Sequence, residues 1–534
     1  MDNSKLIKEP IGLYMAEIFK KYKKNEAISF PEGNKKFTYE ELEEKIDNTA
    51  KVLIGIGIKR GDHIAILSQS SPEYIILLLA TVKIGAVLVC INYNACKSEL
   101  EYVLKQSDSI MIFASEELLE MVTELCPQMI VNSKETKLNE NFPLLKAIFI
   151  LETLSNLEQD MMNTKSISDE TLRKVSSLVT YKDIGTIQYT SGTTGKPKAV
   201  MSTHYGIINN AIVSAENFGF NENDRLVLGL PLFHVMGCIL TAILILTVGG
   251  TLVVIKRFQT KKVLQIIQDE KCTGFNGVPT MYKFMLNYSS DYDVSSLRKG
   301  MIAGSYCSPK LMKKIMKDLN MHELSTIYGQ TEAMGITQTI ISDKKEYRLK
   351  TVGKPIYGVE AKICDIETGN ELMQGETGEL CIRSEYLMLG YYKNEEETNK
   401  TVRDGWLHTG DIAQINKDGY IILKDRLKEI IIRGGENISP LEIEETLMQY
   451  DKIEDVVVIG VPDNVMGEEI FAYVKPKDNS LTKDEIYSYS LKNLAKYMKP
   501  KYIEFINEFP VTSSGKVKKF ILKEQAKYKC GISE

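Results

Sequence analysis

The fold is decided by residues 63–92, HIAILSQSSPEYIILLLATVKIGAVLVCIN, in which two short apolar strands flank a helix. The strands HIAILSQ and AVLVCIN are aliphatic and β-branched, and the segment between them, from Pro72, has the length and composition of a helix. Further apolar strands follow at residues 109–115 and 145–151. Strands that alternate with helices predict parallel or mixed sheets covered by helices, so we expect an α/β fold.

The C-terminal part of the sequence has a different pattern. Between about residues 350 and 424 short strands alternate with turn signals, which indicates a β-rich lobe, and Lys417-Asp418-Gly419 predicts a hairpin turn between two alternating runs. A compact unit of strands and helices follows, and Ser439 is the expected N-cap of its first helix. We therefore predict a large N-terminal domain at 1–424, a hinge at 425–428 and a small mobile α/β domain at 429–534.

The composition excludes several classes of protein. A chain of 534 residues is too long for one small domain, and 43% hydrophobic with 26% charged residues is ordinary for a globular protein. The net charge of −5 at pH 7, with both signs interspersed, creates no field that favours nucleic acid or an anionic membrane. We expect no nucleic-acid partner, and any anionic ligand must be held by a local site.

The nine cysteines are scattered along the chain, with no Cys-x-x-Cys pair among them. This distribution is typical of free thiols in a reducing cytosol, and it argues against a Cys-based zinc or iron–sulfur site. The first residues carry charges throughout and include no apolar run long enough for a signal peptide. We expect a cytoplasmic protein.

One segment, residues 235–255, is uncharged over the 21 residues VMGCILTAILILTVGGTLVVI. A membrane-spanning helix needs about 20 such residues, but Gly249 and Gly250 divide this segment. The part before the pair is helix-compatible and the part after it is strand-like. The sequence predicts a buried helix followed by a buried strand, and no integral membrane segment.

The densest chemical signal is the run YTSGTTGKPK at residues 189–198. Its glycines free the backbone, its hydroxyls donate hydrogen bonds and its lysines supply positive charge, which together suit a polyphosphate. It lacks the spacing of a Walker A loop, so γ-phosphoryl transfer loses support. A hydroxyl-rich surface loop is the alternative. The candidate ligands of nucleotide phosphates in this run are Thr190, Ser191, Gly192, Thr193, Thr194, Gly195, Lys196 and Lys198.

Four further motifs follow the run in order. They are Tyr328-Gly329-Gln330-Thr331-Glu332, Thr409-Gly410-Asp411, Asp425-Arg426-Leu427-Lys428 and Ser514-Gly515-Lys516. With these motifs in this order, from Phe37 to Val517, the chain resembles the adenylate-forming superfamily and, in detail, its medium- and long-chain fatty acyl-CoA synthetases. The resemblance implies an acetyl-CoA synthetase-like or luciferase-like fold. It also implies that a carboxylic acid reacts with ATP, with Mg²⁺, to form an acyl-adenylate that is then captured by CoA.

The resemblance implies a role for each motif residue around the nucleotide. The loop would hold the β- and γ-phosphates, Glu332 would bind Mg²⁺, a hard cation that takes oxygen ligands, and Thr331 would donate to the α-phosphate. Asp411 would accept both ribose hydroxyls, Arg426 would add a donor to the ribose, and Tyr328 would stack on adenine. The alternatives are a solvated acid for Glu332, a surface ion pair between Asp425 and Arg426, and a core position for Tyr328.

Other matched positions belong to the moving parts and the acyl pocket. Lys516 corresponds to a mobile catalytic cation, Lys428 to the hinge, and Gly434 with Gly435 to the strand that meets CoA. His234 matches a position at the mouth of the acyl tunnel, with a core histidine as the alternative. The segment Ala303-Gly304-Ser305-Tyr306 resembles a pocket-lining stretch, but Tyr306 stands where proline is usual. From it we assign Gly304 and Ser305, together with Gly329, to the nucleotide site.

The leading function is an AMP-forming acid–thiol ligase acting on a fatty acid, with CoA as the acceptor. A stand-alone adenylation enzyme that loads a separate carrier protein is the alternative, and a luciferase-like oxygenase shares the same motifs. A transport protein for apolar ligands would have no use for Lys516, Asp411 and Glu332 together. The sequence leaves the acid and the oligomeric state open, a homodimer included.

Overall fold

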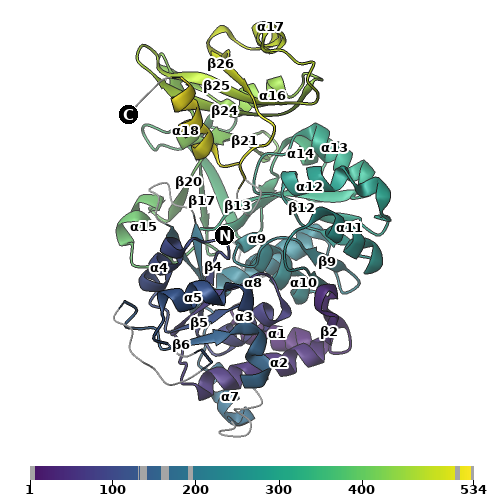
Figure 1. Ribbon diagram of the computed structural model, residues 1–534, viewed down its shortest axis with the longest axis vertical. Coiled ribbons are helices and arrows are strands. Elements are labelled where there is room, and N and C mark those ends of the chain that lie inside the picture. The colour runs from purple at the N-terminus through teal and green to yellow at the C-terminus, as the bar shows by residue number, and fades with distance from the viewer. Residues whose placement is uncertain are drawn as a thin grey trace. The chain divides into compact units, whose positions relative to one another are not determined.

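A computed structural model describes residues 6–129, 131–132, 141–157, 167–190, 197–511 and 517–530 (Figure 1). The chain divides into two compact units. The first consists of Met1–Arg348, Gly353–Glu360 and Arg383–Leu407. The second consists of Leu349–Val352, Ala361–Ile382 and His408–Glu534.

One sheet of the first unit has seven strands in the order β18-β8-β7-β4-β3-β5-β6. Its strands are β3 (His63–Leu67), β4 (Val87–Ile91), β5 (Met111–Ala114), β6 (Ala147–Ile150), β7 (Ile184–Thr190), β8 (Lys198–Thr203) and β18 (Gly390–Tyr391). The pairs among β3 to β7 are parallel, whereas β8 and β18 are antiparallel additions. The four strands and the helix expected in the first 151 residues are all present.

Helices cover this sheet, as Figure 1 shows. Helix α3 joins β3 to β4 and starts at Pro72, where the N-cap Ser71 accepts a hydrogen bond from the Tyr74 amide. Residues of α4 and α5 share an apolar core with β3, β4 and β5. The N-terminal helices of the chain are α1 (Ile11–Lys21), α2 (Tyr39–Gly55), α3 (Pro72–Lys83), α4 (Lys97–Gln106), α5 (Leu119–Leu125) and α7 (Asp169–Ser176).

The second sheet of this unit has nine strands in the order β15-β14-β13-β12-β11-β9-β10-β1-β2. Its strands are β1 (Glu26–Phe30), β2 (Lys35–Thr38), β9 (Arg225–Leu228), β10 (Thr251–Val254), β11 (Gly274–Phe275), β12 (Lys299–Ile302), β13 (Glu323–Gln330), β14 (Met334–Gln338) and β15 (Lys354–Pro355). Helix α8 contacts strands of both sheets. The helices from α8 onward in this unit are α8 (His204–Phe218), α11 (Thr260–Asp269), α12 (Pro279–Leu286), α13 (Pro309–Asp318), α14 (Lys345–Lys350) and α15 (Glu395–Thr401). Helix α14 crosses the division between the two units at its last residues.

The uncharged segment is a buried helix followed by a buried strand, as predicted. It contains α9 (Val235–Gly237), the π-helical turn η4 (Cys238–Ile243), α10 (Leu244–Thr247) and then β10. The π-helical turn was not expected from the sequence. Asn276 lies against it, donating to the Leu240 carbonyl at 3.0 Å and to the Thr241 hydroxyl at 3.2 Å. Across the described residues, every helix is too short or too polar to cross a bilayer.

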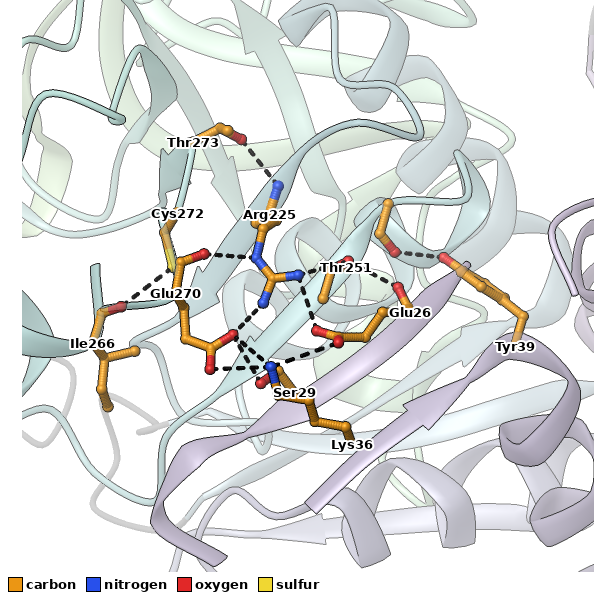
Figure 2. A network of polar contacts seen from close by, with 11 residues as sticks. Glu26, Ser29, Lys36, Tyr39, Arg225, Thr251, Ile266, Glu270, Cys272 and Thr273 are labelled. Carbon is orange, nitrogen blue, oxygen red and sulfur yellow. Dashed lines mark hydrogen bonds and ion pairs between the residues drawn. The ribbon is translucent and has the colours of Figure 1, made fainter. Parts of the chain in front are cut away.

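The amino ends of three parallel strands, β1, β10 and β9, are tied together by the network in Figure 2. Arg225, the first residue of β9, donates to Glu26 at 2.9 Å and to the Glu270 carbonyl at 2.8 Å, and it also pairs with the Glu270 carboxylate. Lys36 pairs with both acids, at 3.7 Å to Glu26 and 3.4 Å to Glu270. Since ligands of open α/β sheets bind at the carboxyl ends of the strands, this Arg225 network is structural.

A third sheet has five strands in the order β16-β17-β20-β19, with β21 paired to β20. Its strands are β16 (Val359–Cys364), β17 (Thr377–Ser384), β19 (Val402–Arg403), β20 (Trp406–Ile415) and β21 (Ile421–Arg426). Strands β20 and β21 form the hairpin that the sequence predicts. The β-rich character expected for residues 350–424 is thus confirmed.

The fourth sheet belongs to the second unit and has the order β23-β22-β25-β24, with β26 paired to β25. Its strands are β22 (Ile431–Arg433), β23 (Glu436–Ile438), β24 (Ile453–Asp463), β25 (Gly467–Pro476) and β26 (Tyr502–Phe505), and its helices are α16 (Pro440–Leu447), α17 (Lys483–Asn493) and α18 (Lys519–Lys529). Ser439 caps α16 as predicted, accepting from the Glu442 amide at 3.3 Å. The α/β fold class, with a large N-terminal part and a small C-terminal α/β unit, is therefore confirmed.

Candidate active site

The glycine- and hydroxyl-rich run connects two antiparallel strands. Thr190 ends β7, Lys198 begins β8, and the two residues face each other in the register of the pair. Residues 191–196, which include the predicted Ser191, Gly192, Thr193, Thr194, Gly195 and Lys196, lie outside the described residues. A Walker A loop joins a strand to a helix, so the hairpin supports the prediction that this loop is of another kind.

Lys198 belongs to a cluster of four side chains, which we call the Glu332 cluster: Lys198, Glu332, Tyr391 and Glu397. The ammonium of Lys198 pairs with the Glu397 carboxylate and lies 5.2 Å from the centre of the Tyr391 ring. The Tyr391 hydroxyl donates to Glu332 Oε1 at 2.7 Å. Tyr391 reaches this place because β18 pairs with β8, with Tyr391 opposite Val200.

Burial keeps Tyr391 a hydrogen-bond donor. The pKa of its phenol is raised above the ordinary value, first by burial and then by the neighbouring Glu332 carboxylate. The phenol therefore stays protonated and donates a hydrogen bond to Glu332. Glu332 offers carboxylate oxygens, the hard ligands that fit Mg²⁺.

Glu332 and Thr331 lie in the turn between β13 and β14, and both are half-buried. The Glu332 carbonyl accepts a hydrogen bond from the Met388 amide at 2.8 Å, which fixes the turn beside β18. The turn also requires glycine at position 329, because an added Cβ would lie 1.9 Å from the Met334 carbonyl oxygen. Tyr328, just before it, is 9% exposed.

Three more predicted residues follow strands of the same nine-stranded sheet. Gly304 and Ser305 come directly after β12, which is parallel to β13, and Gly304 has a left-handed backbone with φ +86°. His234 comes after β9 and is half-buried, with its ring 4.2 Å from that of Phe233. The carboxyl ends of parallel strands meet at one edge of a sheet, so these residues and Glu332 occupy the edge at which ligands bind.

The second unit contains the ribose-binding candidates. Asp411 on β20 and Arg426 on β21 face each other in the strand register, and Arg426 Nε lies 3.1 Å from Asp411 Oδ1. The Asp411 side chain is 7% exposed and that of Arg426 is 46% exposed. The acid paired with Arg426 is thus buried, so this pair differs from an ion pair between two exposed side chains.

The turn before Asp411 is held from β17. Glu379 Oε1 accepts from the Gly410 amide at 3.0 Å, and Thr409 donates to the Leu380 carbonyl at 2.7 Å. The Asp411 amide donates in turn to the Thr409 hydroxyl at 3.1 Å. These bonds fix the backbone of Asp411 from a strand about thirty positions earlier in the sequence, which sequence reasoning did not identify.

Three further predicted residues, Lys428, Gly434 and Gly435, lie in the second unit. Lys428 is exposed in the short helix η6 (Leu427–Glu429). Gly434 and Gly435 form the turn between β22 and β23, with φ angles of +60° and +87° that favour glycine. Lys516 lies outside the described residues.

Tyr391, Glu397 and Glu379 are functional candidates that the sequence did not single out. Glu397 belongs to no motif that the sequence analysis recognised, and its partner, Lys198, lies 199 positions earlier in the sequence. Tyr391 follows a glycine within Leu389-Gly390-Tyr391, and Glu379 follows one within Gly378-Glu379-Leu380. A neighbouring glycine was the available signal for Tyr391 and Glu379, and Glu397 had none.

Comparison with known proteins matches the chain to two families. Residues 15–392 match the family described as AMP-binding enzyme, and residues 442–516 match the AMP-binding enzyme C-terminal domain. The Bacillus subtilis protein YngI is 37% identical over 98% of either chain. The human mitochondrial medium-chain acyl-CoA ligase ACSF2 is 32% identical over 96% of this chain and 87% of its own length.

Solved structures show the same fold. The anthranilate CoA ligase AuaEII in complex with anthranoyl-AMP superposes with a TM-score of 0.87, at 25% identity over 99% of this chain and all of the other. ATP-bound MatB from Rhodopseudomonas palustris gives a TM-score of 0.85, at 24% identity over 98% of this chain and all of the other. The expected acetyl-CoA synthetase-like fold and the resemblance to the adenylate-forming superfamily are both confirmed.

Proposed function

The chain belongs to the AMP-binding enzyme family, and from this premise we propose that it is an AMP-forming acyl-CoA ligase. Its substrate is a medium- or long-chain fatty acid, its nucleotide is ATP, and its acceptor is CoA. The name of the related human enzyme, a medium-chain acyl-CoA ligase, supports the choice of acid and acceptor.

The reaction proceeds in two transfers. A carboxylate oxygen of the acid attacks the α-phosphorus of ATP, the bond from that phosphorus to the bridging oxygen breaks, and pyrophosphate leaves. The sulfur of CoA then attacks the acyl carbonyl, the bond from this carbon to the AMP oxygen breaks, and the thiol proton is released. AMP and the thioester are the products.

The residues of the chain have separable tasks in this scheme. The loop between β7 and β8 binds the β- and γ-phosphates, and Thr331 donates to the α-phosphate. Asp411 accepts the ribose hydroxyls, with Arg426 beside it, and Tyr328 contacts adenine. Glu332 would hold Mg²⁺, which neutralises phosphate charge when bound. The same residues that bind the nucleotide thereby orient its α-phosphate toward the acid.

The single observation that supports this function most is the Glu332 cluster beside the phosphate loop. It brings the Glu332 carboxylate and the Lys198 ammonium to the same tyrosine, Tyr391, and Lys198 begins the second strand of the hairpin that we propose binds polyphosphate. This is the combination that a nucleotide with its metal requires.

Pyrophosphate release over a panel of carboxylic acids of increasing chain length, with and without CoA, tests the proposal. We expect acyl-adenylate and pyrophosphate with the cognate acid alone, and AMP, pyrophosphate and acyl-CoA in equal amounts when CoA is present. ADP in place of AMP would refute adenylation. Adenylate formation without transfer to CoA would instead indicate a carrier protein as the acceptor.

The hinge is part of the same proposal. Lys516 serves adenylation and Lys428 is the pivot about which the small domain turns before thioester formation. We expect Lys516→Ala to slow adenylation by about 10²–10³, by analogy with other lost transition-state contacts, and to leave acyl transfer from preformed adenylate to CoA intact. Lys428→Pro, which fixes φ, should slow the transfer step more than adenylation. Equal losses in both half-reactions for Lys516→Ala, in a folded protein, would contradict this assignment.

A further inference from the structure

A second group of chemically active side chains lies on β17 and β20. Glu379 and Cys381 are two positions apart on β17, so they share one face of that strand, and His408 lies on the neighbouring strand β20. One ligand atom of each, a carboxylate oxygen, a thiol sulfur and an imidazole nitrogen, lies within 4.8 Å of the other two. We call these three residues the Glu379 triad.

The triad converges on a single ring nitrogen. His408 Nδ1 lies 2.7 Å from Glu379 Oε2 and 3.4 Å from Cys381 Sγ. The Cys381 and Glu379 side chains are buried, and His408 is largely so, with 13% of its side chain exposed. Cys364, a buried residue of the adjacent strand β16, lies near the Cys381 thiol and interacts with it.

This donor set matches the ligands of Zn²⁺, which is bound by thiolate, imidazole and carboxylate in a tetrahedron. With metal–ligand distances of about 2.0–2.3 Å, donors of a tetrahedral site stand roughly 3.3–3.7 Å apart. The separation of Cys381 Sγ from His408 Nδ1 already has this value. The distance between His408 Nδ1 and Glu379 Oε2, which is 2.7 Å, must increase by less than ~1 Å to reach this range.

We propose that Glu379, Cys381 and His408 form a binding site for Zn²⁺, and that occupancy of this site weakens ATP binding. Zn²⁺ would replace the proton shared by His408 Nδ1 and Glu379 Oε2 and would displace the proton of the Cys381 thiol. The absence of Cys-x-x-Cys pairs in the sequence argued against a Cys-based zinc site. Strand pairing assembles this one from residues 27 positions apart, with three different kinds of ligand.

The link to ATP is the second carboxylate oxygen of Glu379. Its Oε1 accepts from the Gly410 amide, directly before Asp411. A metal that draws the Glu379 carboxylate toward Cys381 pulls on this hydrogen bond and moves the turn that carries the ribose acceptor. This second half of the inference rests on the proposed function, whereas the metal site itself does not.

Titration with Cd²⁺, a spectroscopic substitute for Zn²⁺, tests the site directly. We expect an ultraviolet thiolate-to-cadmium charge-transfer band that saturates at one metal per chain and is reversed by excess Zn²⁺. Cys381→Ser should abolish the band, and His408→Gln should weaken binding at least about tenfold. Cys96→Ser is the matched control, because Cys96 is an exposed thiol of the first unit, whereas the triad belongs to the second, and its removal should leave this band unchanged.

The effect on ATP needs a separate measurement. Zn²⁺ should raise the KM for ATP of the wild-type chain by about tenfold, as expected when a binding group is displaced by a fraction of an ångström. Cys381→Ser should retain basal activity and lose this sensitivity to Zn²⁺. Its circular dichroism and thermal unfolding establish that it is folded.

The outcomes separate the two halves of the inference. A charge-transfer band that survives in Cys381→Ser, or its absence in the wild-type chain, overturns the metal site. A band that behaves as expected, with the same KM for ATP with and without Zn²⁺, overturns the link to Asp411. Absence of adenylation in the zinc-free wild-type chain, supplied with Mg²⁺ and the panel of acids, refutes the proposed function while the spectroscopic result stands.

Discussion

The Arg225 network and the Glu332 cluster, both in the first unit, each contain two acids, but they pair these acids with cations differently. In the Arg225 network each acid, Glu26 and Glu270, contacts both cations, Arg225 and Lys36. In the Glu332 cluster the cation Lys198 pairs with Glu397, whereas Glu332 is hydrogen-bonded by a neutral phenol. The charges of the first arrangement hold strands together. In the second, we propose that the Glu332 carboxylate binds a ligand.

The position of each cluster in the fold agrees with this reading. The Arg225 network lies at the amino ends of β1, β9 and β10, and Glu332 follows the carboxyl end of β13. Ligands of open α/β sheets bind beyond the carboxyl ends. The contrast predicts that substitutions in the first cluster change stability, and that substitutions in the second change activity.

Glu332→Gln should have the largest effect. The amide keeps the size of the side chain and accepts from Tyr391, but it lacks the charge that binds Mg²⁺. We expect adenylation to fall by about 10²–10³, comparable with the loss of other groups that stabilise charge in a transition state. Single-turnover pyrophosphate release at increasing Mg²⁺ measures it.

Glu397→Gln is the matched control for that prediction, since it also neutralises an acid of the cluster but leaves Glu332 charged. Its effect should be much smaller. If Glu332→Gln kept the wild-type rate at ordinary Mg²⁺, the carboxylate would be a solvated acid and the contrast between the clusters would disappear.

Arg225→Met should lower stability without changing the chemistry. The substitution leaves Glu26 and Glu270 with one cation fewer in a partly buried setting, and we expect the free energy of unfolding to fall by about 1–3 kcal/mol. Chemical denaturation measures the change. Lys97→Met, which breaks the exposed pair with Glu124, is the control and should change stability little. Loss of adenylation in folded Arg225→Met would mean that the network has a role beyond structure.

Asp411→Asn tests whether a buried, paired acid is always structural. Asp411 resembles the acids of the Arg225 network in having an arginine partner, yet we assign it to the ribose. We expect the KM for ATP to rise about tenfold or more, because charge-assisted hydrogen bonds are the stronger ones. Asp418→Asn, in the exposed turn of the same hairpin, should leave the KM unchanged. An unchanged KM for Asp411→Asn would return the Asp411–Arg426 pair to a structural role.

The sequence predicted the strands and the hairpin of β20 and β21 well because their signals are local. The alternation of residues in β20 and β21 and the cap at Ser439 lie within a few positions of one another. The partners of the site residues were not predicted, because strand pairing brings them from far away. Tyr391 reaches Glu332 over 59 positions and Glu379 reaches Gly410 over 31. No periodicity within a window of the sequence carries that information.

The smallest expected effect belongs to Tyr391→Phe, which removes the hydroxyl bonded to Glu332 and keeps the ring beneath Lys198. Because the carboxylate remains, Mg²⁺ can still bind, but its ligand is less well positioned. Loss of one hydrogen bond to a charged group costs about 1.5–3 kcal/mol when its partner stays buried. Glu332 is half-buried and water can replace the phenol, so we expect a smaller loss, about three- to tenfold in adenylation, with a higher Mg²⁺ requirement.

The neighbouring tyrosine supplies a control of the same chemistry. The hydroxyl of Tyr392 also donates to a carboxylate, Asp108 at 2.8 Å, in a pair that includes no proposed site residue. Tyr392→Phe should therefore leave the Mg²⁺ dependence of adenylation unchanged, whatever it does to stability. A structural role for Tyr391 would lower activity at every Mg²⁺ concentration alike. A positioning role predicts a loss that saturating Mg²⁺ partly restores, and equal responses of the two variants to Mg²⁺ would rule that role out.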